Sequence, residues 1–260
     1  MSRSGIEPLF AEAASWDLFD ANVRVGPSGI HGELALGAAA LLEEMERFAI
    51  RNALVSHWTA EEYDAETGNR ALERDLLPRF TPAWAALPDA EALDALAARR
   101  PLAVRLSPGV NQHNFPLASW CAGPLFEYLQ ARSVLVLISR ADIEWDVLAR
   151  VMADFPALVV VLLDVGYRSD RYLFPLLAKF RQLHFDGATY LAHRQLEAFV
   201  DRDGPDRLLF GSRLPLYTPA AALGVLASAR ISSDARLGIA GGNLRRLLAA
   251  CRNRAAQVGA

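Results

Sequence analysis

The sequence has 260 residues, of which 52% are hydrophobic, and its formal net charge is −3. A chain of this length forms one large domain or two small ones and buries about three quarters of its unfolded surface. Its 27 basic and 30 acidic residues are nearly balanced, which argues against a surface for nucleic acid or for an anionic membrane.

The start of the chain, MSRSGIEPLF, lacks the apolar core of a signal peptide. The longest apolar run, ALVVVLL, is much shorter than the about 20 residues of a membrane helix. The two cysteines, Cys121 and Cys251, are too few for a disulfide framework or a cysteine metal cluster. We therefore expect a cytoplasmic protein.

Short apolar runs of strand character alternate along the chain with segments of helical periodicity. The eight predicted strands cover residues 18–26, 53–58, 80–87, 102–108, 134–139, 158–164, 183–189 and 208–212. Because eight parallel strands close a barrel, this pattern predicts an α/β fold, a (β/α)8 TIM barrel, with residues 1–260 forming a single domain. An open doubly wound sheet is the alternative, but its Gly-rich phosphate loop after the first strand is missing.

The first predicted strand carries an unusual polar face. Side chains alternate along a strand, so Asp20, Asn22 and Arg24 are expected on one face. The other face would hold the apolar residues Phe19, Ala21, Val23 and Val25. Since the outer face of a barrel strand packs on helices, the polar face is expected to look into the barrel. Its groups then form either a hydrogen-bonded core network or part of a site.

Active sites of such barrels lie at the C-terminal ends of the strands. The other strand ends offer His57 with Trp58, Arg105 with Ser107, Ser139, Asp164, Asp186 and Arg213. We expect three arginines and two aspartates to converge on one mouth, namely Arg24, Arg105, Arg213, Asp20 and Asp164. His57 is a candidate base and Trp58 a candidate pocket wall, because both follow the second strand.

Several stretches resemble the amidohydrolase-related family, a branch of the metal-dependent hydrolase superfamily. FDANVRVG is similar to its first-strand motif Asp-x-His-x-His-x-Gly, and FPALVVVLLDVGY to its sixth strand. DRLLFGSRLP resembles its eighth-strand motif Asp-Arg-Ile-Leu-Phe-Gly-Ser-Asp-x-Pro, and ISSDARLGIAGGNLRRLL its closing helix. The resemblance covers nearly the whole chain and implies a barrel that hydrolyses its substrate with a bound metal.

The metal-ligand positions of the family are changed in this sequence. The resemblance places Asn22, Arg24, a residue of 137–139, Asp164 and Arg213 where the family has four histidines and an aspartate. An arginine is always protonated and has no lone pair to donate, and one carboxylate with one amide cannot make the usual zinc site. We therefore predict no metal at this position and no cofactor. A relocated site on His57 and Asp164 is a remote alternative.

Buried arginines require a negative charge, and two answers are open. In the first, Asp20 and Asp164 form salt bridges with Arg24 and Arg213, which makes a centre that is non-catalytic for metal-dependent hydrolysis. In the second, a small carboxylate or phosphate ligand is clamped by the arginines, with Asn22, Arg105 and Trp58 beside it.

The enzymatic alternative is a metal-independent hydrolase, lactonase or lyase acting on a carboxylated small molecule. Arg24 and Arg213 would hold the substrate, and Asp164 or His57 would act as the base. The resemblance implies a precedent, because pyrone dicarboxylate lactonases look like members of this family that work without a metal. Nearby arginines would stabilise the carboxylate of Asp164 and weaken it as a base, so we favour loss of the ancestral hydrolysis. The oligomeric state is open, with a homodimer as one possibility.

Overall fold

A computed structural model describes residues 11–258 of the chain. Eight parallel strands pair in the order in which they occur along the chain. They are β1 (Leu18–Val25), β2 (Ile50–His57), β3 (Phe80–Ala85), β4 (Ala103–Leu106), β5 (Leu135–Ser139), β6 (Val159–Leu163), β7 (Leu183–Asp186) and β8 (Leu208–Leu209). Each of the eight predicted strand segments overlaps one of these strands.

The sheet curls until its last strand meets its first. The chain that follows β8 contacts β1, where the amide of Ala21 donates to the carbonyl of Phe210 at 2.9 Å. The amide of Arg24 donates to the carbonyl of Leu214 at 3.0 Å. The predicted (β/α)8 barrel is therefore confirmed.

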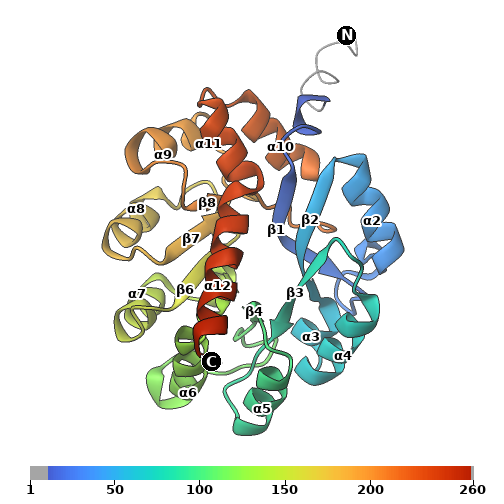
Figure 1. The fold of residues 1–260 in the computed structure, drawn as a ribbon, viewed down its shortest axis with the longest axis vertical. Coiled ribbons are helices and arrows are strands. Elements are labelled where there is room, and N and C mark those ends of the chain that lie inside the picture. The colour runs from blue at the N-terminus through green and yellow to red at the C-terminus, as the bar shows by residue number, and fades with distance from the viewer. Residues whose placement is uncertain (1–10, 259–260) are drawn as a thin grey trace.

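A ring of helices surrounds the strands, as Figure 1 shows. The ring contains α2 (Ala38–Arg47), α4 (Ala65–Asp75), α5 (Ala90–Ala98), α6 (Ser119–Ala131), α7 (Trp145–Asp154), α8 (Asp170–Lys179), α9 (Gln195–Asp203) and α10 (Pro219–Ser228). The short helix α3 (Trp58–Glu62) directly follows β2, and α11 (Ser233–Leu237) precedes the closing helix α12 (Asn243–Val258). Within the described residues, no helix combines the length and apolar character that a membrane crossing requires.

The strands bury apolar side chains on both faces. Along β5, Leu135 and Leu137 belong to a cluster inside the barrel, while Val136 and Ile138 pack with the surrounding helices. Leu244, Leu248 and Cys251 of α12 join the inner cluster. The closing helix thus covers the end of the barrel at which the strands begin and leaves the other end for a site.

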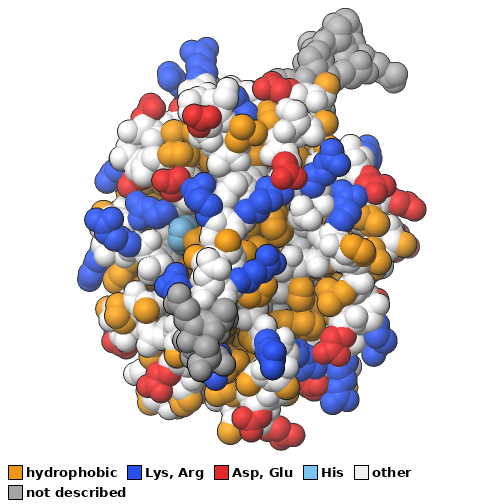
Figure 2. All heavy atoms as spheres, in the orientation of Figure 1, with side chains coloured by type: hydrophobic (Ala, Val, Ile, Leu, Met, Phe, Trp, Pro, Cys, Tyr) orange, Lys and Arg blue, Asp and Glu red, His pale blue; other side chains and the backbone are white. Residues whose placement is uncertain are grey.

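Figure 2 shows the face that α12 crosses, with lysine and arginine side chains spread over it. The helix itself contributes Arg245, Arg246, Arg252 and Arg254. Arg245 and Arg246 form ion pairs with Asp17 and Asp206 at 2.9 and 2.8 Å. Part of this positive charge is therefore neutralised within the chain.

The predicted division of β1 into two faces is wrong for its first half. Phe19 and Ala21 belong to the inner cluster, whereas Val23 packs with the outer helices. The pairing of β1 with β2 shifts register between Leu18 and Phe19 and again between Asp20 and Val23. Such irregularities break strict alternation, so that Ala21 and Asn22 both face inward.

Candidate functional site at the mouth of the barrel

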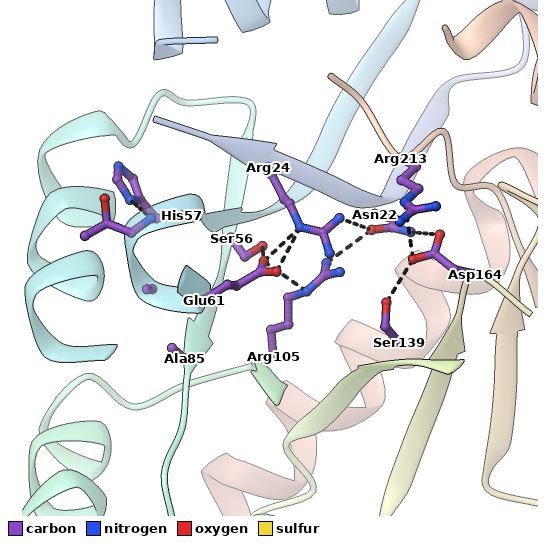
Figure 3. A network of polar contacts seen from close by, with 12 residues as sticks. Asn22, Arg24, Ser56, His57, Glu61, Ala85, Arg105, Ser139, Asp164 and Arg213 are labelled. Atoms are coloured by element: carbon purple, nitrogen blue, oxygen red, sulfur yellow. Dashed lines mark hydrogen bonds and ion pairs between the residues drawn. The ribbon is translucent and has the colours of Figure 1, made fainter. Parts of the chain in front are cut away.

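The amide group of Asn22 stands at the centre of a polar network at the C-terminal ends of the strands (Figure 3). Its Nδ2 donates to Asp164 Oδ1 at 3.0 Å and to Asp186 Oδ2 at 2.9 Å. Its Oδ1 accepts from Arg105 Nη1 at 3.1 Å and from Arg24 Nη1 at 3.4 Å. One neutral side chain therefore separates two carboxylates from two guanidinium groups.

A second group of contacts centres on the buried carboxylate of Glu61. Arg24 Nε donates to both of its oxygens, at 3.0 and 2.9 Å, and Arg105 Nε lies 3.0 Å from Oε1. Ser56 Oγ donates to the same Oε1 at 2.6 Å. The three charged side chains are between 2% and 6% exposed, so water screens them little. We call this group the Arg–Glu–Arg triad.

The pKa values of Glu61 and Arg105 are both shifted within the triad. Burial raises the pKa of Glu61, but the guanidinium groups of Arg105 and Arg24 outweigh it and hold that pKa below its usual range. Burial, followed by the charge of Arg24, lowers the pKa of Arg105 to about 10. Glu61 and Arg105 are therefore both charged at neutral pH, and the triad sets two guanidinium groups against one carboxylate.

Glu61 was not predicted from the sequence, because it lies on a helix and not at a strand end. The helix α3 begins directly after β2, where His57 Nδ1 accepts a hydrogen bond from the Thr59 amide at 3.1 Å. One turn later the chain carries Glu61 back over the barrel. The stretch HWTAEE could have indicated it, because a helix that starts directly after a strand brings an acidic residue close to the arginines of the neighbouring strands.

The expected pairing of Arg24 with Asp20 or Asp164 is wrong, because Glu61 takes that role. Asp164 instead accepts a hydrogen bond from Ser139 Oγ at 2.9 Å and lies 3.6 Å from Arg213 Nε. Both Asp164 and Arg213 have positive φ angles, 57° and 61°. Residues other than glycine seldom adopt this conformation, which is concentrated at functional sites.

Two further carboxylates lie beneath the network and are fully buried. Burial, reinforced by the charge of Asp164, raises the pKa of Asp186 to about 8. Burial also raises the pKa of Asp20 to about 6, although the amides of Asn22 and Ser212 donate to its Oδ1 at 2.9 and 3.0 Å. Asp186 is therefore mainly protonated at neutral pH, next to Asp164, whose side chain is 7% exposed.

The structure does not bring His57 into the network. Its ring points away from Asp164 and Arg213 in Figure 3, and Nε2 lies 3.5 Å from Asp75 on α4. Burial lowers the pKa of His57, against the opposing charge of Asp75. Its observed contacts are those of a residue that joins α3 and α4 to the barrel.

Trp58 lies closer to the triad than His57 does. The guanidinium carbon of Arg24 is 4.7 Å from the centre of its ring, and the ring of His31 lies 4.7 Å away on a tilted plane. The indole is 3% exposed, and its Nε1 has no hydrogen-bond partner within residues 11–258. The ring of Trp58 therefore packs against the guanidinium group of Arg24.

The residues present at the mouth do not fit a divalent metal ion. The only amide oxygen of Asn22 accepts from two guanidinium groups, and Arg24 and Arg213 add positive charge at the mouth. Among residues 11–258, no three His, Cys, Asp or Glu side chains are grouped so that they could hold a metal ion. Carboxylates at this end are instead committed to Arg24, Arg105, Arg213 and Asn22.

No family model matches the sequence. No curated protein matches it either. Solved structures do match over most of the chain. An uncharacterised TIM-barrel protein from Bordetella bronchiseptica is 18% identical, with a TM-score of 0.70, covering 90% of this chain and 99% of its own.

Two decarboxylases have the same fold. The 5-carboxyvanillate decarboxylase from Sphingomonas paucimobilis is 16% identical, with a TM-score of 0.67, and the match covers 90% of this chain and 99% of that one. A dihydroxybenzoic acid decarboxylase from Polaromonas sp. JS666, solved with manganese and 2-nitroresorcinol, is 15% identical, with a TM-score of 0.70, covering 89% and 96%. The chain has the barrel fold of the amidohydrolase-related proteins. The network around Asn22 lies at the end of this barrel that α12 leaves open.

Proposed function

We propose that this amidohydrolase-type barrel has lost metal-dependent hydrolysis and binds a small anion, a carboxylate or phosphate, at its mouth. The observation that carries the proposal is a pair of arginine nitrogens without acceptors. Nη2 of Arg105 and Nε of Arg213 are buried and have no hydrogen-bond partner within residues 11–258. Leaving a charged donor buried and unpaired is costly, so an acceptor-rich ligand would gain free energy there.

The charges at the mouth support the same class of ligand. Three arginines, Arg24, Arg105 and Arg213, stand against two ion-paired carboxylates, Glu61 and Asp164. Arg24 and Arg105 share Glu61, so these five side chains carry one more positive than negative charge. Arg213 is the accessible member, with 27% of its side chain exposed, so it provides the entry side of the anion site.

The loss of the metal is tested by metal analysis. The purified chain is incubated with Zn²⁺ or Mn²⁺, dialysed and measured by elemental mass spectrometry. We expect far less than one equivalent, because two guanidinium groups occupy the ligand side of Asn22. A tightly bound stoichiometric metal would overturn this part of the proposal.

The anion site is tested by thermal unfolding with malonate, succinate and inorganic phosphate at constant ionic strength. A ligand at 100 times its Kd stabilises the folded chain by about 2.7 kcal/mol, which raises the Tm by several degrees. Arg213→Gln should abolish the shift. Arg181→Gln, an exposed arginine ahead of β7, is the matched control and should keep it. No shift with any of the three anions would reject an open anion site.

A metal-independent hydrolase, lactonase or lyase is the second candidate, with Asp164 as the base. The supporting observation is that Asp164 is held by Ser139 and Asn22 on a strained backbone, next to Arg213. Decarboxylases named for aromatic carboxylates share the fold, which makes such acids and lactones the first substrates to screen. Turnover that Asp164→Asn abolishes, and His57→Gln leaves intact, would establish this candidate.

A further inference from the structure

A groove on the rim of the barrel lies beside the site and has a different composition. It encloses about 290 Å³ and is lined by Arg140, Trp145, Tyr167, Arg168 and Tyr172, among others. One wall follows Ser139 at the end of β5, and the other follows Asp164 after β6. Because Ser139 and Asp164 are hydrogen-bonded to each other, the groove starts next to the mouth. We call it the rim groove.

The rim groove is built from stacked aromatic rings. Trp145 and Tyr172 stack at 5.3 Å between ring centres, with 7° between their planes. Tyr167 and Tyr172 are 58% and 54% exposed, which leaves ring surface open to solvent. Flat aromatic surfaces of this kind bind other rings in stacked or edge-on geometry.

Positive charge surrounds these rings. The guanidinium of Arg140 lies 4.7 Å from the centre of the Trp145 ring, and that of Arg168 lies 5.2 Å from the Tyr167 ring. Arg168 has no ion pair within the described part of the chain, and the carboxylate facing Arg140 is the 80% exposed Glu144 at 3.6 Å. Exposed pairs of this geometry contribute little.

The carboxylate of Asp170, the residue that begins α8, is hydrogen-bonded to residues outside the groove. Asp170 Oδ1 accepts from the hydroxyl of Tyr190 at 2.7 Å and from Gln195 Nε2 at 2.9 Å. Both contacts direct this carboxylate toward β7 and α9. The groove thus combines open ring surface with the guanidinium of Arg168 and with that of Arg140, which donates to the Ile143 carbonyl and has an exposed carboxylate partner.

We propose that the rim groove is a second binding site, separate from the mouth, for a single-ring aromatic carboxylate. The ring stacks on Tyr172 and Tyr167, and the carboxylate pairs with Arg168 and Arg140. Stacking favours an aromatic over a saturated ring of the same charge. The guanidinium groups favour the carboxylate over an uncharged aromatic alcohol. The ligand must therefore have both features.

The test compares three probes by titration calorimetry on the full chain: benzoate, cyclohexanecarboxylate and benzyl alcohol. A stacking contribution of up to about 1.4 kcal/mol predicts that benzoate binds up to tenfold tighter than cyclohexanecarboxylate. Benzyl alcohol should bind more weakly than benzoate. Equal affinity for the two acids, or no benzoate binding at any soluble concentration, would overturn the rim site.

Variants locate the binding. Tyr172→Leu and Arg168→Gln should each weaken benzoate at least several-fold, and Tyr167→Leu provides a second ring variant. Tyr63→Leu and Arg181→Gln remove an exposed tyrosine and an exposed arginine elsewhere and should change nothing. Circular dichroism confirms that each variant is folded.

Arg213→Gln separates the rim site from the mouth. Benzoate binding that survives this variant while the malonate shift disappears supports two sites. Benzoate binding that Arg213→Gln abolishes and Tyr172→Leu leaves unchanged would reject the rim site but keep the mouth site. If the unaltered chain binds none of the acids, both the rim site and the anion site at the mouth are rejected.

Discussion

Removing the anion of the Arg–Glu–Arg triad should lower the free energy of unfolding more than removing one of its two cations. In Glu61→Gln, the two guanidinium groups lose their shared carboxylate and remain buried together. Both Nε atoms lie 3.0 Å from Oε1 of Glu61, which places them at most about 6 Å apart. At that distance two unit charges repel by roughly 3 kcal/mol in an effective dielectric of 20. Breaking a buried ion pair costs about 3–5 kcal/mol in total, a large part of a typical stability of 5–15 kcal/mol.

Arg105→Met should cost less than Glu61→Gln, although it removes a larger side chain. It leaves Arg24 and Glu61 as a balanced pair, whereas Glu61→Gln leaves two cations without an anion. The double variant Glu61→Gln/Arg105→Met should recover part of the loss of Glu61→Gln, because one of the two repelling charges is gone.

The assay is urea unfolding followed by far-UV circular dichroism at pH 7. Glu44→Gln is the control, since Glu44 forms an exposed ion pair with Arg47 and should change stability by less than about 1 kcal/mol. If Glu61→Gln behaves like Glu44→Gln, water solvates the triad and the burial on which the reasoning depends is wrong. If Arg105→Met costs as much as Glu61→Gln, the excess of positive charge is not what sets the energy.

Three further outcomes follow from the same contacts. With its folded pKa raised to about 8, Asp186 is protonated in the folded chain and ionised in the unfolded chain between about pH 4 and pH 8. As the pH rises through this window, the free energy of unfolding should therefore fall by up to about 1.4 kcal/mol for each pH unit. Asp186→Asn should flatten this pH dependence, which is measured by urea titrations at several pH values. Gly26→Ala should lower the Tm clearly, because φ is +87° and a Cβ would lie 2.0 Å from His57 Nε2, whereas Gly37→Ala meets no atom within 4 Å and should have little effect. Arg213→Met should change the free energy of unfolding by less than about 1 kcal/mol, because its side chain is 27% exposed and lies 3.6 Å from its partner.

The barrel was predictable because its signal is repeated along the whole chain. Runs such as VLVLIS and LVVVLLD are apolar on both faces, as strands covered inside and outside must be. Helix ends were also readable where the chemistry is local. Thr218 accepts from the Ala220 amide at the start of α10, and Pro219 takes the first helical position, two residue types typical of these places.

The faces of β1 were not predictable because alternation is a rule for regular strands. The register shifts between Asp20 and Val23 add no signal to the sequence, yet they bring Ala21 and Asn22 to the same side. Asn22 lies at the C-terminal ends of the strands, but the sequence did not reveal which groups it contacts. The contacts of this amide depend on Arg24 of the same strand and on three other segments of the chain, which carry Arg105, Asp164 and Asp186.

The sequence predicted that buried Arg24 needs an anionic partner, but not which residue provides it. Buried Arg24 needed an anion, and the strand ends offered Asp20 and Asp164 as the visible choices. The actual partner, Glu61, depends on the chain turning into α3 at once after β2. This difference changes what the mouth can bind. Because Glu61 holds Arg24 through both carboxylate oxygens, Arg24 has little to offer a ligand. We therefore assign the proposed anion clamp to Nη2 of Arg105 and Nε of Arg213, which make no hydrogen bond within residues 11–258, and Arg213 is the more exposed of the two.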